Sequence, residues 1–425
     1  MSASNSFIEK KLVPIAGKIG ANKALIAVRD GITLAMPLII IGSLFMIIAS
    51  FPFPGWWTTW LEDVGVAGYL WKGVDSSFGL VGLIASFGIA QSMASQFKVD
   101  GVASGIVSLS AFIMVTPFVT GEAGAGIAVP YMGASGLFVA IVLGLINGYI
   151  YQWFINRNIQ IRLPDSVPPA VSRSFSAIIP GAVIISFWLV VYGVLDSLNL
   201  PDLHNLMQNI LGGPLGLLGG NIFGTVIVAG LNSLFWFFGL HGGNTVNQIM
   251  QPVWLANLDS NVTAFQAGEE LTQIITTPFM DNFVYIGGGG ATLGLVLVIA
   301  FIARRRNASI QSKTMAPLTL VPGLFNINEP AMFGIPVVLN PMLIIPFIIA
   351  PMANAIISYL AMSWGLVPLT RVAAAWTMPP IISGFLTTGS INGSILQIIL
   401  IIINVLIYLP FYIAVERANQ SQELK

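Results

Sequence analysis

This sequence has few charged residues and no cysteine. Only 8% of its 425 residues are Asp, Glu, Lys or Arg, whereas a soluble domain carries about 25% because its surface faces water. This shortage argues against a soluble enzyme. The absence of cysteine excludes disulfides, thiolate metal sites and phosphocysteine chemistry within this chain. Lys plus Arg and Asp plus Glu both number 17, so no nucleic acid or polyanionic partner is expected.

Histidine is also scarce. His204 and His241 are the only two in the chain, which leaves little material for a metal cluster, and we expect neither a metal nor a cofactor. Hydrophobic residues, by contrast, make up 56% of the chain. They form uncharged runs at residues 32–50, 136–155 and 395–415, close to the roughly 20 residues that a helix needs to cross a bilayer. The sequence therefore predicts an all-α polytopic membrane protein.

The basic residues predict how the chain crosses the membrane, because Lys and Arg collect on the cytoplasmic side. The expected spans are 32–51, 78–97, 102–118, 136–155, 177–196, 221–240, 243–258, 284–303, 339–363 and 391–415. With a cytoplasmic N-terminus, 15 basic residues lie inside and only Lys72 and Arg371 lie outside. Removing the short span 243–258 changes this balance to 10 against 7. We therefore expect about ten transmembrane helices, with both termini in the cytoplasm.

Three regions follow from this threading. Residues 1–31 mix apolar and basic positions, which is typical of an amphipathic helix on the cytoplasmic face. A cytoplasmic connection is expected at 156–176, which contains three prolines. The rest of the chain is assigned to an N-terminal transmembrane half, 32–200, and a C-terminal transmembrane half, 201–425.

Polar residues at membrane depth mark candidate sites, since irregular backbone survives there only when protein or a cavity covers it. The stretch 239–244 reads Gly-Leu-His-Gly-Gly-Asn, which predicts a broken helix that lets a ligand approach His241 and the backbone. A flexible loop is the alternative. The stretch 276–283 contains a proline, Asp281 and Asn282, and four glycines follow. It predicts a re-entrant hairpin in which Asp281 caps a half-helix or binds a hydroxyl.

The third stretch, 322–330, reads Pro-Gly-Leu-Phe-Asn-Ile-Asn-Glu-Pro. A carboxylate without a basic neighbour is costly in an apolar environment, so Glu329 is a candidate ligand-binding group. A structural ion pair with Arg371 is the alternative. One carboxylate, one imidazole and several amides suit the hydroxyls of a neutral polar solute such as a disaccharide, whereas an anion would require an arginine clamp. Trp254 and Trp376 could stack on sugar rings or belong to an interfacial belt.

Two of these stretches carry a family resemblance. Residues 239–244, together with Phe-Asn-Ile-Asn-Glu-Pro at 325–330, resemble the membrane (IIC) component of the bacterial sugar phosphotransferase system, in its lactose/cellobiose/diacetylchitobiose branch. The likeness extends over essentially the whole chain. It implies a homodimer in the bacterial inner membrane, with 32–200 forming the dimer contact and 201–425 the sugar site. It also implies an elevator-like movement of the sugar.

The resemblance further implies roles for partners and residues. The sugar's 6-hydroxyl would be phosphorylated by a separate IIB protein bearing a phosphocysteine, with IIA upstream. This chain would take part in the transfer but carry no phosphoryl group itself. Glu329 would act as general base, and His241 would orient the hydroxyl. The remaining residues of the site would be Asn244, Asp281, Asn282, Asn326, Asn328 and Trp376. Basic residues in 156–176 and 304–313 would meet IIB, or simply reflect the positive-inside rule.

Two other functions fit the same residues. A secondary transporter driven by protons or sodium ions could use Glu329 and Asp281 as coupling acids, because broken helices at the membrane midplane are typical of such proteins. A receptor or scaffold without transport is the second. Transport that delivers a phosphorylated sugar would distinguish a phosphotransferase permease from a secondary transporter and from a receptor or scaffold.

Overall fold

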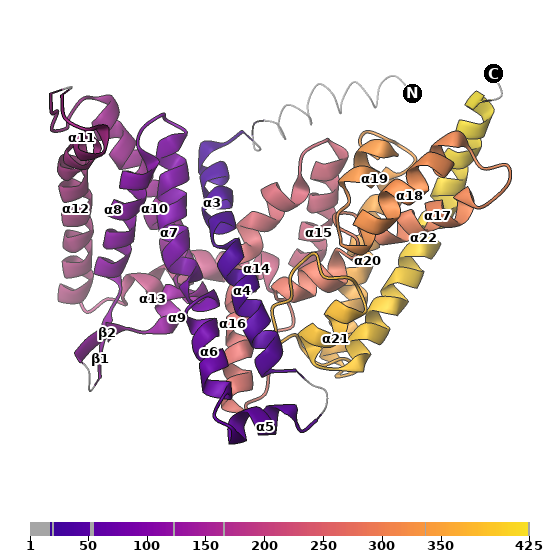
Figure 1. The fold of residues 1–425 in the computed structure, drawn as a ribbon, viewed down its shortest axis with the longest axis horizontal. Coiled ribbons are helices and arrows are strands. Elements are labelled where there is room, and N and C mark those ends of the chain that lie inside the picture. Colours follow the sequence, from indigo (N-terminus) through magenta and orange to yellow (C-terminus); the bar gives the residue numbers. More distant parts are fainter. Residues whose placement is uncertain are drawn as a thin grey trace. The chain divides into compact units, whose positions relative to one another are not determined.

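The fold is almost entirely helical (Figure 1). The computed structural model describes residues 18, 21–51, 55–121, 124–164, 166–335 and 337–423. The chain divides into two compact units. We call residues 18–42 and 71–215 the N-unit, and residues 43–70 and 216–425 the C-unit.

The N-unit is a bundle of helices with one β-hairpin. Its elements are α3 (Lys23–Leu34), η2 (Phe78–Leu80), α7 (Val81–Ser95), α8 (Gly101–Val115), β1 (Phe118–Gly121), β2 (Gly124–Ile127), α9 (Val129–Met132), η3 (Ala134–Gly136), α10 (Leu137–Asn156), α11 (Pro169–Ser176), α12 (Ile178–Ser197), α13 (Leu203–Met207) and η4 (Gln208–Gly212). The antiparallel hairpin pairs Thr120 with Ala125, and it is the exception to the predicted all-α fold.

The C-unit contains α5 (Trp57–Asp63), α15 (Ile222–Phe237), η5 (Gly243–Asn247), α16 (Gln248–Ala267), η6 (Phe279–Val284), α17 (Leu293–Ala303), α18 (Ile310–Leu324), α19 (Glu329–Gly334), α20 (Ile344–Ser363), α21 (Ile382–Thr388) and α22 (Ile391–Glu423). Three helices, α4 (Met36–Ala49), α6 (Ala67–Asp75) and α14 (Gly213–Gly219), each contain a boundary between the units. The units therefore differ from the predicted halves, since 43–70 groups with 216–425.

Small residues allow the helices of the N-unit to pack closely. A Cβ atom at Gly144 of α10 would lie 2.6 Å from the Cβ atom of Ile89 on α7. A Cβ atom at Gly31 of α3 would lie even closer to the same isoleucine. Glycine at these contacts permits the close backbone approach that membrane helices use for packing.

Buried polar groups also join the helices of the N-unit. The fully buried Asn147 donates from Nδ2 to Ser108 Oγ on α8 (3.2 Å) and accepts from Trp188 Nε1 on α12 (2.7 Å). His204 is buried as well, and its Nε2 lies 2.9 Å from Thr116 Oγ1. Each contact satisfies groups that would be costly to bury alone.

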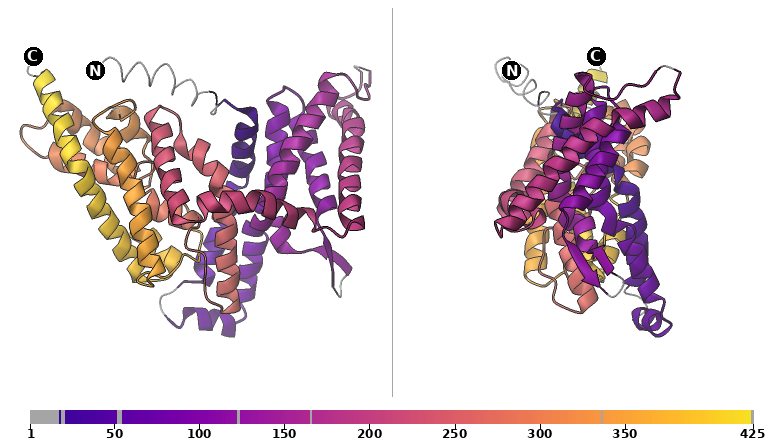
Figure 2. Two further views of the ribbon diagram at one scale, coloured as in Figure 1. Left: turned by 180° about the vertical axis from the view of Figure 1, so that it is seen from behind. Right: turned by 90° about the vertical axis from the view of Figure 1, so that its left-hand side faces the viewer.

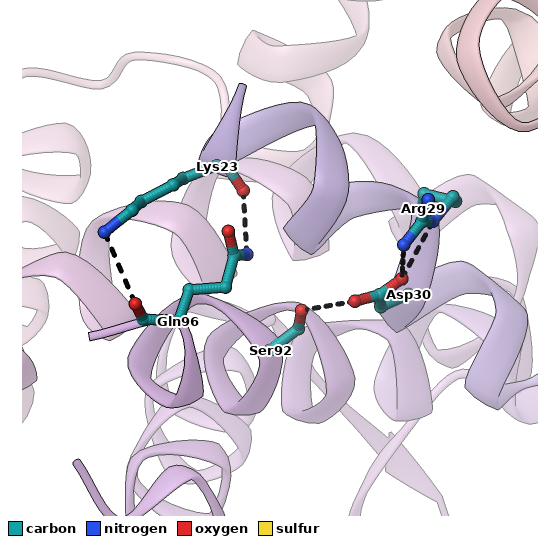
Figure 3. Close-up of polar contacts among 5 residues, drawn as sticks. All are labelled: Lys23, Arg29, Asp30, Ser92 and Gln96. Carbon is teal, nitrogen blue, oxygen red and sulfur yellow. Dashed lines mark hydrogen bonds and ion pairs between the residues drawn. The ribbon is translucent and has the colours of Figure 1, made fainter. Parts of the chain in front are cut away.

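Helix α3 begins at Lys23, where the Asn22 side chain accepts from two backbone N–H groups. Figure 3 shows how α3 is held against α7. Asp30 accepts from Ser92 Oγ (2.8 Å) and forms an ion pair with Arg29, while Gln96 Nε2 donates to the Lys23 carbonyl (3.0 Å). Residues 23–31 of the predicted amphipathic segment are thus part of a packed helix. Residues 1–17, 19 and 20 of that segment lie outside the described residues.

Several helices of the C-unit pack against its last helix. α17, α20 and α21 all contact α22, which runs for 33 residues (Figures 1 and 2). A Cβ atom at Gly294 of α17 would lie 2.6 Å from the Cβ atom of Asn404 on α22. The core here includes Leu295, Ile299, Phe347 and Tyr408, all fully buried.

Six helical segments in the described residues are long and apolar enough to cross a membrane, or seven if the bent pair 203–219 and 222–237 counts as one span. Two shorter apolar helices, α8 and α17, add to these. The predicted spans at 243–258 and 284–303 differ in form, because the first begins as the π-helix η5 and the second is helical only from Leu293. The count of ten crossings and the sidedness of the termini remain predictions.

Candidate functional site

Two side chains selected from the sequence meet in the C-unit. His241 lies in the loop after α15, and Glu329 is the first residue of α19. His241 Nε2 and Glu329 Oε1 are 3.9 Å apart, and the two side chains are 43% and 48% exposed. The structure therefore brings the imidazole and the carboxylate together where a ligand can reach both.

The orientation of His241 is set by its neighbours. Its Nδ1 accepts a hydrogen bond from the backbone N–H of Asn244 (3.0 Å), so the neutral ring carries its proton on Nε2. The Trp236 ring lies 4.2 Å from the imidazole, measured between centroids. Asn244 thus contributes through its backbone, while its side chain is exposed. Nε2 is the ring atom that lies 3.9 Å from Glu329 Oε1.

The two asparagines before Glu329 are used to fix the backbone. Asn326 Oδ1 accepts from the Gly287 N–H (2.7 Å), and its Nδ2 donates to the carbonyls of Trp376 (2.5 Å) and Met378 (3.2 Å). Asn328 Nδ2 donates to the Gly289 carbonyl (3.0 Å). Both side chains are about 95% buried. Both amides therefore hold other segments of the backbone in place beside Glu329.

The four glycines at 287–290 form a turn whose backbone is hydrogen-bonded by these two asparagines. Gly288 has φ +93°, in the left-handed region that favours glycine. A Cβ atom there would lie 2.8 Å from both the Asn326 carbonyl oxygen and the Asn328 Cγ. This position consequently accepts only glycine without movement of the chain next to Glu329.

Asp281 and Asn282 belong to the π-helix η6. Asp281 is partly exposed, whereas Asn282 is 1% exposed. Neither amide atom of the Asn282 side chain has a hydrogen-bond partner in the described part of the chain. Asn282 therefore faces the protein interior in this conformation, and a direct contact with a ligand would require it to turn. π-Helical turns are rare overall but frequent at functional sites. η5 overlaps the stretch predicted as a broken helix, and η6 overlaps the stretch predicted as a re-entrant hairpin.

The two candidate tryptophans have different environments. Trp376 is 40% exposed, and its carbonyl is bound by Asn326, so its indole is available for stacking beside this network. Trp254 is fully buried and donates from Nε1 to the Gly219 carbonyl (2.9 Å). Trp254 is thus neither a stacking platform nor part of an interfacial belt in this structure.

Arg371 does not form the alternative ion pair. Its guanidinium lies 4.1 Å from the centre of the Phe265 ring, and its backbone N–H donates to the Thr387 carbonyl (2.9 Å). Within the described ranges, the salt-bridge partner of Glu329 is His241 and not Arg371. Glu329 is therefore not locked to the arginine in this structure.

Several polar residues near the site were not selected from the sequence. Asn247 Oδ1 accepts from Asn232 Nδ2 (2.8 Å) and from the Tyr285 hydroxyl (3.2 Å), which links α15, η5 and the segment after η6. Gln397 on α22 donates to the Asn282 carbonyl (2.7 Å). Asn247 lies in the same polar stretch as Asn244, whereas Asn232 and Gln397 are single amides in apolar helices. An isolated amide of this kind is too common to identify a site residue.

Comparison with known proteins identifies the family. The sequence model of the family "Phosphotransferase system, EIIC" matches residues 29–351, which include His241 and Glu329. This chain belongs to the EIIC family of the phosphotransferase system. EIIC components are integral membrane proteins that take a sugar and work with IIA and IIB proteins. The resemblance stated from the two sequence stretches is confirmed.

Relatives of this EIIC protein cover its full length. It is 42% identical to the lichenan permease IIC component of Bacillus subtilis (strain 168), with all of this chain and 95% of that protein aligned. It is also 42% identical to the cellobiose-specific EIIC component of Geobacillus stearothermophilus, over 98% of this chain and 95% of that one. The crystal structure of the transporter ChbC, the IIC component from the N,N'-diacetylchitobiose-specific system, matches with a TM-score of 0.91 and 38% identity, covering 98% and 99% of the two chains.

Proposed function

We propose that this EIIC protein is the permease for a neutral β-linked disaccharide of the cellobiose or diacetylchitobiose type. Relatives with such sugars in their names align over nearly the whole chain. The site offers one carboxylate, one imidazole and backbone-fixing amides. Arg371 lies in the same loop as Trp376, residues 364–381, but its guanidinium packs on the Phe265 ring. This donor set suits hydroxyl groups, which both donate and accept hydrogen bonds.

The separation between His241 and Glu329 is the observation that carries the proposal. At 3.9 Å, the two atoms are too far apart for a direct hydrogen bond, which needs about 2.7–3.2 Å. A hydroxyl oxygen about 2.8 Å from each atom completes a nearly right-angled triangle with them. Such a hydroxyl would accept from Nε2–H of His241 and donate to Glu329. The pair is therefore spaced to hold one sugar hydroxyl between them.

The same geometry supports a role in phosphoryl transfer. As the hydroxyl oxygen attacks the phosphorus of a phosphocysteine on IIB, the new O–P bond forms and the P–S bond breaks. The cysteine sulfur leaves as a thiolate, and the hydroxyl proton passes to Glu329 as general base. His241 orients the oxygen by its hydrogen bond. The phosphocysteine belongs to the partner because this chain has no cysteine.

The proposal extends to movement and assembly. His241, Asp281, Glu329 and Trp376 all belong to the C-unit, so one compact unit could carry the bound sugar in an elevator-like motion. The N-unit exposes large apolar side chains along α12, including Leu189 and Val190. This face is suited to lipid or to the contact of a homodimer.

Glu329→Gln tests the function. Membrane vesicles with the wild-type protein, given labelled cellobiose and phosphorylated IIB, should release the sugar 6-phosphate. The variant should bind the sugar but lose most of the transfer, about 10²-fold or more, because an amide cannot take the proton. Glu62→Gln, which changes an exposed carboxylate on α5, is the matched control and should retain full activity.

Two results would contradict the proposal. Full phosphorylation by Glu329→Gln would remove the base role. Accumulation of unmodified cellobiose driven by a proton or sodium gradient would favour a secondary transporter with Glu329 and Asp281 as coupling acids.

A further inference from the structure

The backbone from η6 to the glycine turn leaves several carbonyl groups without helical partners. A π-helix of six residues, Phe279–Val284, forms few internal hydrogen bonds, and no α-helix follows it until Leu293. Unsatisfied backbone groups at membrane depth are energetically costly, because no water is present to bind them. Side chains from other helices must therefore bind these carbonyls.

Three fully buried side chains do so. Asn354 on α20 donates from Nδ2 to the Val284 carbonyl (3.1 Å). Gln397 on α22 donates from Nε2 to the Asn282 carbonyl (2.7 Å), and the Tyr408 hydroxyl on the same helix donates to the Gly290 carbonyl (2.6 Å). Buried side chains of α20 and α22 thus hold η6, which carries Asp281, and the glycine turn that follows it.

Gln397 differs from the other two because it also binds a second segment. Its Oε1 accepts from the backbone N–H groups of Ile381 (2.5 Å) and Gly384 (2.9 Å). Its Nε2 also donates to Ser383 Oγ (2.9 Å). The two ends of one amide therefore connect η6 with the first turn of α21, and every hydrogen-bonding position of this side chain is occupied.

The segment bound by Oε1 is held in an unfavourable conformation. Ile381 has φ +76°, which is a genuine outlier for a β-branched residue. Such a conformation persists only where surrounding groups impose it. Gln397 binds its N–H group, and Ser394 Oγ donates to its carbonyl (2.6 Å). Five residues earlier stands Trp376, whose carbonyl is bound by Asn326.

We propose that Gln397 is a positioning residue for sugar recognition. It fixes η6, which carries Asp281, relative to the loop 364–381, which carries Trp376, without touching the sugar. This inference rests on the proposed function and extends it to a residue outside the site. Asn326 holds the Trp376 end of the loop, and Gln397 holds the Ile381 end. Together the two amides keep the distance between the Trp376 indole and Asp281 constant. A site whose groups are already in place binds a rigid disaccharide at a lower entropic cost.

Gln397→Met keeps the length of the side chain but removes all four hydrogen bonds. The carbonyl of Asn282 and two N–H groups then lose their partners, and both segments relax. With purified protein and cellobiose, calorimetry should show a Kd raised about tenfold, which corresponds to about 1.4 kcal/mol. In phosphorylation assays the KM should rise while kcat changes little, because Glu329 and His241 stay in place.

Asn147→Leu is the matched control. Asn147 is an equally buried amide that joins three helices of the N-unit, so its loss lowers stability without touching the site. It should lower the Tm as much as Gln397→Met but leave the Kd within about twofold of the wild type. This comparison separates positioning from general destabilisation.

A milder variant covers the case in which Gln397→Met does not fold. Ser394→Ala removes only the hydrogen bond to the Ile381 carbonyl and should raise the Kd about threefold. If wild-type protein binds cellobiose and the folded variants bind it equally well, the positioning role is refuted while the proposed function stands. If the wild type binds neither cellobiose nor diacetylchitobiose, the proposed function fails, and the inference fails with it.

Discussion

Gly288→Ala is the sharpest test of how the glycine turn supports Glu329. The new Cβ atom would lie 2.8 Å from the Asn326 carbonyl oxygen and 2.9 Å from the Asn328 Cβ. Carbon atoms pack best at about 3.5 Å or more, so the 326–328 backbone must retreat by roughly 0.6–0.7 Å. Because Asn328 directly precedes Glu329, the carboxylate moves with it. A misplacement of about 1 Å can cost about 10²-fold in rate, and we expect a 10- to 100-fold slower phosphorylation.

The same substitution should also lower stability. Alanine in the left-handed region costs roughly 1–2 kcal/mol, and overpacking adds about 1–3 kcal/mol. Two control glycines separate these contributions. Gly268 has φ +70° with no atom near its missing Cβ, and Gly193 has neither feature. Gly268→Ala should therefore show only the cost of the left-handed conformation. Gly193→Ala should show neither that cost nor the cost of overpacking.

The assay pairs sugar phosphorylation in vesicles with the Tm of each purified variant. Only Gly288→Ala should slow the transfer. The reasoning would be refuted if Gly288→Ala phosphorylated cellobiose within twofold of the wild type and lowered the Tm no more than Gly268→Ala does. The turn would then be free to adjust without moving Glu329.

Two further predictions concern side chains beside the site. Trp376→Ala should raise the Kd for cellobiose roughly 3- to 10-fold, since stacking contributes about 0.5–1.5 kcal/mol. An unchanged Kd in calorimetry would favour the alternative, in which Trp376 belongs to the interfacial belt. Arg371→Met should keep the phosphorylation rate within about threefold of the wild type, because Arg371 lies on Phe265 and not against Glu329. A loss as large as that of Glu329→Gln would restore the ion-pair alternative.

Glu329 and His241 can be identified as site candidates from the sequence. A carboxylate and an imidazole are scarce and costly in an apolar chain, so their presence indicates a functional role. The structure places them 3.9 Å apart. Scarcity identified the two groups, but nothing in the sequence specified that they face one another, since this depends on how the loop after α15 packs near α19.

Residues of common types cannot be assigned from the sequence. The resemblance implies that Asn282 belongs to the site, and only the structure shows that its side chain is buried in this conformation. Trp254 and Trp376 were equivalent on composition, and only burial separates them. Gln397 was not selected at all, because an amide in an apolar helix has many possible roles until its partners are known.

Composition alone determined that this chain belongs in a bilayer, because a protein with so few charges cannot cover its surface against water. Local patterns determined where the backbone departs from regular helix, since glycine, proline and amides interrupt apolar runs at those points. Only the tertiary structure decided which interrupted segments meet, which amides bind backbone and which side chains remain open to a ligand. Those outcomes depend on contacts between helices distant in sequence, and such contacts leave no local pattern.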